Sequence, residues 1–591
     1  MHKVELFPAK DYIGAKGVLP FDLRETVKTE NKFWDLKNEN GKINKDWCLK
    51  LHKGNVFKYC KKFLPLFGFY KYRTSDRADS DALIIQKKGR IVRLVGSPKD
   101  KDVNDSLKDW TIDCIQYLST RNSMLRIPKN LEDEVFKCPA LWDTLVTSFL
   151  PPLPQVEVNR MDKDGNIITD KKDQVPIQDS VDQGKLVFKN KIFIIRKGVE
   201  PQVVDYNNFP SNYFIWESDI IPHEITDDFD ISKPKGMWYE FLQNISKECD
   251  GEWKINENNF RTIISAYGYL LHDYNTISHR KAIIFHDNTI NEKEGGNGKG
   301  ILSKSFSRTG IKRDWSVDMK QDANSDRFLL DGYTPDMRIV RFEDIQKGLN
   351  FERFYCWITD DFTVEGKNRS KFVIPEDDAP KIILTTNYPI PNSSRSDKRR
   401  QFFVPIGTFY GTLLERNNIT VSDYHGTNLA TRKDCTWTEE EWTDFYATCA
   451  YCLREYLEHG LVECSNKILQ DQQVFRICGG DDLLVKDLGQ FIDEVLSRSP
   501  SECSREEVDR VFQSPEFEKY KDYSPKWRTT MFKKFCGAKN ISVNANKKGG
   551  RYQKVVNNNN EKMDYYILYQ NEKKTDEPPK VGLQAFLVEA T

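Results

Sequence analysis

The sequence predicts an α/β protein built around a parallel sheet. Between residues 280 and 410, short apolar strands alternate with segments of helical periodicity, which is typical of a parallel sheet covered by helices. An α+β pattern precedes this region, at about residues 54–120. A separate unit that ends in a basic stretch follows Gly479 and Gly480. With 591 residues, the chain is long enough for several domains.

We expect six segments along the chain. Pro151 and Pro152 precede a polar stretch rich in Asp, Lys and Gln, which predicts a linker or an exposed hairpin. The segments are an N-terminal α+β accessory domain (1–150), the polar linker or hairpin (151–184), a β-rich and then helical segment (185–279), the sheet domain with its helical C-terminal part (280–470), a basic winged-helix-like domain (475–575) and a tail (576–591).

Composition narrows the functional classes. The 89 Lys and Arg residues balance the 89 Asp and Glu residues, so any binding of nucleic acid must come from local basic patches. No apolar run approaches the roughly 20 residues that span a bilayer, and the N-terminus lacks the apolar core of a signal peptide. We therefore expect a cytoplasmic protein without membrane contact.

The cysteine pattern favours reduced thiols. The 13 cysteines are odd in number and thinly spread, which does not fit a disulfide framework. Cys449 and Cys452, flanked by Cys435 and Cys464, have the spacing of a zinc-binding pair. However, they lie within the helical pattern of residues 439–460, whereas zinc pairs usually occupy tight turns. The sequence favours small core residues over a zinc site.

A glycine-rich run between a strand and a helix predicts a phosphate-binding loop. Residues 282–285 form the strand, and the helix begins at Lys299. Glycines let backbone N–H groups surround anionic oxygens, while the helix dipole and a lysine attract the phosphates. The standard pattern is broken at Lys293, where the first glycine belongs, and at Gly300, where a magnesium-binding hydroxyl belongs. The predicted loop comprises Gly295, Gly296, Asn297, Gly298, Lys299, Gly300 and Ile301.

An acidic pair follows a second strand. Glu343 and Asp344 end the strand at 338–342, and adjacent carboxylates at such a strand end can hold Mg²⁺ and polarise the attacking water. Asp360 and Asp361 are a rival pair, but the residues before them predict a helix. The sequence therefore favours Glu343 and Asp344.

An amide and two arginines complete the pattern. Asn387 follows the strand at 381–386, where its amide could sense a γ-phosphate. Arg399 and Arg400 precede the apolar run at 402–404, and an arginine at this point can complete the site of a neighbouring subunit. A charged surface without a catalytic role is the alternative for these arginines.

With strand, loop, carboxylates, Asn and Arg in this order, the region resembles the superfamily 3 helicases, AAA+ type ring motors of small viruses, phages and plasmids. More narrowly, it is similar to the helicase part of the phage and mobile-element primase-helicase group. The resemblance covers about residues 185–465 and also rests on the segments 268–272, 281–284, 380–387 and 437–442.

The resemblance implies an AAA+ P-loop ATPase core that uses ATP and Mg²⁺. Lys299 would be the Walker A lysine, and Glu343 and Asp344 the Walker B pair. Asn387 would be the sensor. Arg399 or Arg400 would be the arginine finger of a ring homo-oligomer, which we expect to be a hexamer.

The family also has a hairpin whose basic tip tracks single-stranded DNA. Residues 363–372 fit this hairpin, with Lys367, Arg369 and Lys371 as the candidate DNA-binding residues. A solvated β-turn is the alternative. Lys281, just before the first strand, is a further candidate for nucleotide contact.

Relatives of this kind often carry a primase domain. Asp79 and Asp81 have the spacing of a primase acidic pair, but polar residues precede them, and no histidine occurs between His52 and His223. We expect no primase active site in this chain, and a separate primase or polymerase as a candidate partner.

A local basic excess marks the C-terminal unit. From Lys519 to Lys554 there are 11 Lys and Arg residues and a single acid, Asp522. A helix at 526–536, a strand, a basic turn and a returning strand predict a winged helix. A basic surface on a structural domain is the alternative, with the helix aromatics in its core. The candidate DNA-binding residues are Lys533, Lys534, Lys547, Lys548 and Arg551.

The sequence thus predicts an ATP-dependent, ring-forming helicase on single-stranded or forked DNA, acting in replication of a phage, plasmid or other mobile element in a bacterial host. A replication initiator, or a defence or packaging ATPase without processive unwinding, is the alternative. A small-molecule kinase would be a monomer indifferent to DNA. Since Gly300 has no hydroxyl, magnesium would rest on Glu343, water and nucleotide, or on Ser303.

Overall fold

The computed structural model falls into two compact units, residues 1–288 with 292–464, and residues 465–591 with 289–291. It describes residues 4–12, 35–36, 49–50, 59–72, 83–97, 101–121, 150–161, 167–275, 280–287, 296–319, 328–346, 349–365, 372–388, 390, 395–464, 482–513, 523–539, 541–544, 552–555 and 562–570. Several predicted residues lie outside these ranges: Asp79, Asp81, Gly295, Lys367, Arg369, Lys371, Lys547, Lys548 and Arg551.

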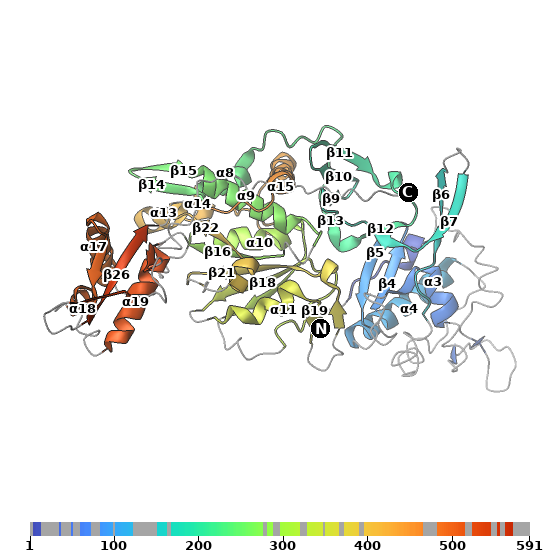
Figure 1. The fold of residues 1–591 in the computed structure, drawn as a ribbon. Helices are drawn as coiled ribbons and strands as arrows, with labels where there is room; N and C mark the ends of the chain where they lie inside the picture. Colours follow the sequence, from blue (N-terminus) through green and yellow to red (C-terminus); the bar gives the residue numbers. More distant parts are fainter. Residues whose placement is uncertain are drawn as a thin grey trace, which may run out of the picture. The chain divides into compact units, whose positions relative to one another are not determined.

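A five-stranded parallel sheet forms the centre of the first unit (Figure 1). Its strands lie in the order β17 (Asp314–Asp318), β18 (Ile339–Ile345), β21 (Lys381–Thr386), β16 (Ala282–Asp287) and β22 (Gln401–Ile406). All neighbouring pairs are parallel. The predicted parallel α/β sheet is therefore confirmed, and the carboxyl ends of the five strands meet at one edge.

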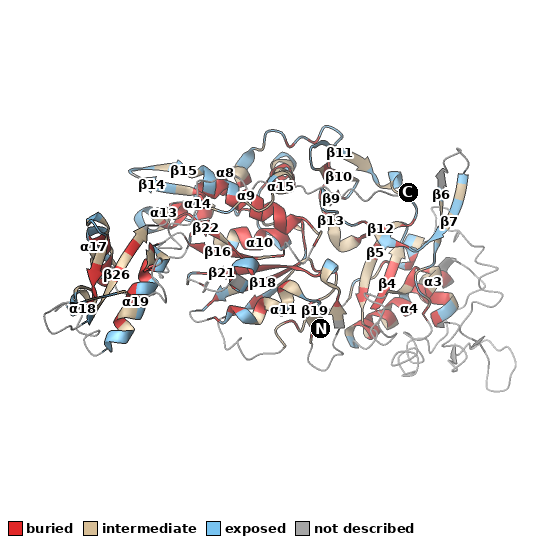
Figure 2. Ribbon diagram, in the orientation of Figure 1, coloured by how far each residue is buried: buried red, intermediate tan, exposed pale blue. Residues whose placement is uncertain are grey.

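Both faces of this sheet are buried (Figure 2). Successive side chains of a strand point to opposite faces. Accordingly, Ile283 and Phe285 belong to a core shared with α8 (Gly236–Asn244), α9 (Glu257–Leu271), α10 (Lys299–Thr309) and α15 (Glu439–His459). Ala282 and Ile284 belong to a second core shared with α11 (Tyr355–Thr359) and the antiparallel pair β19 (Phe362–Val364) and β20 (Phe372–Ile374). This double coverage explains why the central strands β16 and β21 are buried at every position.

The structure bears on the helix expected before Asp360 and on the helix that contains Cys449 and Cys452. The helix expected before Asp360 is confirmed as η6 (Phe351–Phe354) followed by α11, so Asp360 and Asp361 do not end a strand of the parallel sheet. Cys449 and Cys452 are fully buried inside α15, as the core interpretation expects. Among the described residues, no group of His, Cys, Asp and Glu side chains could hold a metal ion.

A second five-stranded sheet lies in the N-terminal part of the first unit. Its order is β3 (Phe69–Tyr72), β4 (Leu83–Lys88), β5 (Ile91–Gly96), β12 (Tyr213–Trp216) and β8 (Val175–Pro176), and α4 (Lys101–Arg121) packs beside it. The sheet thus draws strands from both sides of residue 150. Part of the polar segment forms an antiparallel hairpin of β6 (Val156–Met161) and β7 (Ile167–Lys172).

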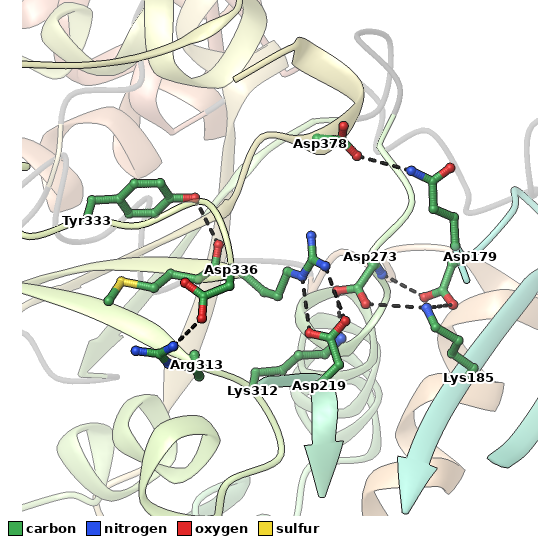
Figure 3. Close-up of polar contacts among 12 residues, drawn as sticks. Asp179, Lys185, Asp219, Asp273, Lys312, Arg313, Tyr333, Asp336 and Asp378 are labelled. Atoms are coloured by element: carbon green, nitrogen blue, oxygen red, sulfur yellow. Dashed lines mark hydrogen bonds and ion pairs between the residues drawn. The ribbon is translucent and has the colours of Figure 1, made fainter. Parts of the chain in front are cut away.

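A third sheet connects this part to the central sheet. It contains β11 (Val199–Asp205), β10 (Lys191–Arg196), β9 (Gln183–Phe188) and β13 (Ile220–Ile221). Lys185 of β9 pairs with Asp179 at 3.0 Å and with Asp273 at 3.7 Å, and Lys312 pairs with Asp273 at 2.6 Å (Figure 3). Arg338 pairs with Asp219 at 3.2 Å. Lys312 and Arg338 precede β17 and β18, so these ion pairs lie at the amino edge of the parallel sheet.

The second unit is a small α/β body. Its elements are α17 (Asp482–Ser497), β23 (Glu502–Ser504), α18 (Arg505–Phe512), α19 (Pro525–Ala538), β24 (Ile541–Val543), β25 (Tyr552–Val555) and β26 (Lys562–Gln570). Phe532 and Phe535 of α19 are fully buried in its core, which confirms the core interpretation of the helix aromatics.

The predicted return of the second strand on the first is wrong, while the basic turn at 547–551 lies outside the described residues. Ile541–Val543 pair with the last residues of β26, and Tyr552–Val555 pair with its first residues, both antiparallel. β24 and β25 therefore run in the same direction and do not return on each other. The local pattern of two short strands around glycines was misleading, because β26 is the common partner of both. No described helix is long and apolar enough to cross a membrane.

Candidate nucleotide-binding site

The glycine-rich loop leads directly into α10, whose first residue is Lys299. Gly296 and Gly298 have φ of +86° and +98°, a conformation that strongly favours glycine. A Cβ at Gly298 would lie only 3.0 Å from the Phe241 ring. Gly300 and Ile301 continue the first turn of α10. The described part of the loop therefore presents a helix N-terminus, with its unpaired backbone N–H groups, at the carboxyl edge of the sheet.

Lys299 lies between two side chains that end neighbouring strands. Its Nζ contacts Oδ2 of Asp287, the last residue of β16, and Oδ1 of Asn387, which follows β21. Burial lowers the pKa of Lys299, while the charges of Asp287 and Asp344 oppose this fall. Burial also raises the pKa of Asp287, against the charge of Lys299. The site thus holds a desolvated cation that an anionic phosphate would stabilise.

Asp287 was missed at the sequence level. The apolar pattern placed the strand end at Phe285, but β16 continues to Asp287. The signal was present, since His286 and Asp287 directly follow the apolar run, and a polar residue at a strand end in a parallel sheet is a site candidate.

The acidic pair sits on a local irregularity of β18. The register between β18 and β21 shifts between Phe342 and Ile345, and Asp344 has a φ of +52°. The Asp344 backbone N–H donates to Oγ1 of Thr385 at 3.1 Å. A non-glycine residue with positive φ is uncommon and costs on the order of 1 kcal/mol. The irregularity leaves the Asp344 side chain exposed.

Glu343 is neutralised by cations that sequence reasoning missed. Arg341 contacts Oε1 of Glu343 through Nη1, and its Nε lies 3.2 Å from Oδ2 of Asp314. Lys304 of α10 lies 3.3 Å from the same Glu343 oxygen. Arg341 was detectable, because residues two apart in a strand point to the same side. Lys304 was not, since only the packing of α10 brings it to β18.

The two candidate arginines differ in their surroundings. Arg400, at the end of α12 (Arg395–Arg400), is 9% exposed and lies with its guanidinium 4.3 Å from the centre of the Tyr355 ring. Its Nη1 donates to the Ser396 carbonyl at 3.3 Å. Arg399 is exposed and makes no ion pair with the described residues. The structure thus leaves Arg399 accessible and holds Arg400 within its own subunit.

Two other candidates lie away from this edge. Lys281 precedes β16 and pairs with Glu463 at 3.3 Å. The six residues of β16, about 20 Å of strand, place Lys281 at the edge of the sheet opposite the loop, which does not support the expected nucleotide contact. Ser303 is fully buried, and its hydroxyl donates to the Gly300 carbonyl at 3.4 Å. Magnesium coordination by Ser303 is therefore not supported.

No protein-family model and no curated protein sequence matches this chain. Among solved structures, it is similar to the A-form apo structure of the NrS-1 C-terminal region, with 11% identity and a TM-score of 0.33 over 86% of this chain and 99% of that chain. It is also similar to JCV helicase, with 13% identity and a TM-score of 0.20 over 42% and 63% of the two chains. A full-length MCM homolog from Methanopyrus kandleri gives 9% identity and a TM-score of 0.21 over 65% and 76%. Because these TM-scores are low, the functional assignment rests on the geometry of the site.

Proposed function

We propose that this chain is an ATP-driven DNA helicase of the superfamily 3 type. One observation carries the proposal: Lys299, Asn387 and the pair Glu343 and Asp344 come from separate elements and meet at the carboxyl edge of one parallel sheet. This edge is where open α/β sheets bind ligands. In this arrangement the lysine would bind phosphate, the carboxylates would hold Mg²⁺ and orient water, and the amide would contact the γ-phosphate.

The sheet order supports an AAA+ type core. β21, which delivers Asn387, lies between β16, which leads to the loop, and β18, which carries the acidic pair. Asn387 therefore stands between the phosphate-binding lysine and the carboxylates. A group in this position can contact a γ-phosphate and the attacking water together.

The residues at this edge fit ATP with Mg²⁺. Lys299 and the N-terminus of α10 would bind the β- and γ-phosphates. Asp344 would hold Mg²⁺, since its carboxylate is exposed and oxygen ligands suit this ion. When bound, Mg²⁺ neutralises charge that develops on the phosphate oxygens. Glu343 would orient the attacking water once its contacts with Arg341 and Lys304 loosen.

The arginine finger and the DNA-binding elements of the proposed helicase follow from the exposure of Arg399 and from the order of the elements. Arg399 would act as the arginine finger across a subunit boundary, because its side chain is exposed. The β19–β20 pair would carry the basic tip that contacts single-stranded DNA. In the second unit, the order of helix, strand, two helices and antiparallel strands supports a winged-helix-like module that would bind DNA through α19.

The direct test compares Lys299, which lies at the carboxyl end of β16, with Lys281, which precedes the amino end of the same strand. Lys299→Ala should abolish ATPase activity and strand displacement on a forked duplex, because the variant loses the cation that binds the phosphates. Lys281→Ala should retain both activities. Wild-type ATPase should be stimulated by single-stranded DNA. Absence of both stimulation and strand displacement would exclude a helicase.

Particle mass and unwinding separate the alternatives. Mass photometry with ATP should show a ring assembly, expected to be a hexamer, because a finger in trans needs a neighbour. DNA-stimulated ATPase without strand displacement would favour an initiator or a packaging ATPase. A monomer whose ATPase ignores DNA would favour a small-molecule kinase.

A further inference from the structure

The side chain of Asn297 is buried, where it contacts Gly411 and interacts with Asp287 at the end of β16. Asn297 lies between Gly296 and Gly298 in the loop, and only 2% of it is exposed. Its Oδ1 accepts a hydrogen bond of 3.1 Å from the backbone N–H of Gly411. Gly411 belongs to α13 (Phe409–Asn417), which follows β22. This contact joins the loop to an element more than 100 residues away.

The bond supplies a missing helix cap. The first N–H groups of a helix have no partner within the helix and are usually satisfied by a side chain at the N-cap. Thr408, the N-cap residue of α13, makes no such bond. Gly411 is the third residue of α13, a position whose N–H a capping side chain normally serves. Asn297 thus caps α13 from outside the helix.

The contact between Asn297 and α13 requires glycine at position 411. A Cβ added at Gly411 would lie 2.2 Å from Oδ1 of Asn297, so any larger residue forces the two apart. The loop also packs closely against α8 on its other side. A Cβ at Gly298 would contact Phe241 of that helix.

The first turn of α13 is itself firmly anchored. The Tyr410 hydroxyl accepts a hydrogen bond of 3.0 Å from Nδ2 of Asn244 and lies 2.6 Å from Nε2 of His425. The Tyr410 ring stacks on Phe241 at a centroid distance of 5.7 Å. Asn297 therefore ties the loop to a fixed support formed by α8, α13 and α14 (Val421–His425).

We propose that Asn297 is a positioning residue, which keeps the loop in its phosphate-binding conformation by capping α13 at Gly411, and that Gly411 is required for this role. The inference rests on the proposed ATP site and names the group that organises it. Asn297 acts through α13 and does not bind phosphate with its side chain.

Three variants of the full chain test this role. Asn297→Ala removes the acceptor, and Gly411→Ala displaces it. Each should raise the KM for ATP about fivefold to tenfold, the effect of removing one helix cap, while kcat changes less than about twofold. The double variant should be no worse than either single variant, because both break the same bond. Alanine favours helix over glycine, so the Gly411→Ala effect would not come from a weaker α13.

A control variant and a binding measurement separate failure of the proposed ATP site from failure of the role proposed for Asn297. Gly489→Ala, in α17, places a Cβ in open space and should leave the KM for ATP unchanged. Binding of a fluorescent ATP analogue is measured beside hydrolysis. If the wild-type chain binds no analogue, the proposed function fails. If it binds and Gly411→Ala binds equally well, this inference fails, and a loss confined to Asn297→Ala would instead indicate that Asn297 acts through Asp287 or the phosphate itself. Should Gly411→Ala not fold, Asn297→Ala with normal ATP binding would still overturn the inference.

Discussion

At the residue scale, the proposed ATP site has a lysine, a carboxylate and an amide, but it lacks the hydroxyl of a serine or threonine after the lysine. Lys299, Asp344 and Asn387 lie together, while Gly300 stands where a serine or threonine would help to hold magnesium. A Cβ added at Gly300 would meet no atom within 4 Å. The structure therefore has room for the hydroxyl that the sequence lacks. Magnesium would depend on the carboxylates, water and the nucleotide alone.

We predict that the wild-type ATPase depends only weakly on magnesium through this loop, and that Gly300→Ser strengthens the dependence. The added hydroxyl should lower the magnesium concentration for half-maximal ATPase by about fivefold, the effect of one added polar interaction. Gly300→Ala is the matched control, because it shares the change in helix propensity but has no hydroxyl. Weaker magnesium binding by Gly300→Ser would contradict the prediction.

Alanine variants of Arg399 and Arg400 should differ in whether they lose activity or stability. Arg399→Ala should lower kcat by roughly 10³-fold and leave thermal unfolding unchanged, as expected for a finger. Arg400→Ala should lower the melting temperature, since it removes a buried guanidinium that packs on Tyr355. Mixing Arg399→Ala with Lys299→Ala subunits should restore part of the ATPase, because some interfaces then pair an intact loop with an intact arginine. No recovery in the mixture would argue against a shared site.

At the element scale, α19 has one buried and one basic face. Phe532 and Phe535 are fully buried, while Lys526, Lys533 and Lys534 are exposed. These three lysines recur at helical spacing, so they share one face of the helix. Such a face can follow the phosphates of a DNA backbone. The predicted helix at 526–536 is present within the bounds of α19.

We expect Lys533→Ala with Lys534→Ala to weaken DNA binding without a change in sequence preference. The magnitude of the slope of log K against log salt should fall by about 2, one for each phosphate that a lysine no longer neutralises. Lys486→Ala, an exposed lysine of α17, is the control. Fluorescence anisotropy with a labelled duplex at several salt concentrations measures the slope. An unchanged slope would favour a merely structural basic surface.

At the scale of the whole molecule, buried ion pairs connect elements of the first unit at the edge opposite the proposed nucleotide site. Asp273 follows α9 and lies against Lys312, which precedes β17, and Lys185 of β9 (Figure 3). Burial disfavours its charge, but Lys312, Lys185 and Arg338 together outweigh burial and hold the pKa of Asp273 well below that of a free aspartate. The ionised form is therefore the one that stabilises the fold.

Asp273→Asn should lower the free energy of unfolding by about 3 kcal/mol, because it leaves the buried ammonium group of Lys312 without its carboxylate partner. A carboxylate with a depressed pKa stabilises the fold above its unfolded pKa, near 3.9, and this stabilisation is lost as the pH falls below that value. The wild-type chain should thus lose stability more steeply than the variant on acidification. Denaturant unfolding at neutral and acidic pH measures both, with the exposed Asp182→Asn as control. Equal stability of Asp273→Asn and wild type at neutral pH would refute a stabilising role.

The sequence by itself determined the parallel sheet and the location of the loop. Apolar runs such as Ala282–Phe285, and glycines that must adopt positive φ, are local signals, and short-range sterics and side-chain periodicity suffice to interpret them. The order of Lys299, Glu343 and Asn387 along the chain then indicated a common edge, because parallel strands bring their carboxyl ends together.

Only the tertiary structure decided which groups touch. Asp287 became the partner of Lys299, Lys304 that of Glu343, and Gly411 that of Asn297. It also separated exposed Arg399 from buried Arg400, and it paired both β24 and β25 with β26. Each of these outcomes depends on helix packing or on strand register between residues distant in sequence. Such contacts are set by the fit of whole elements, which no local pattern of residues encodes.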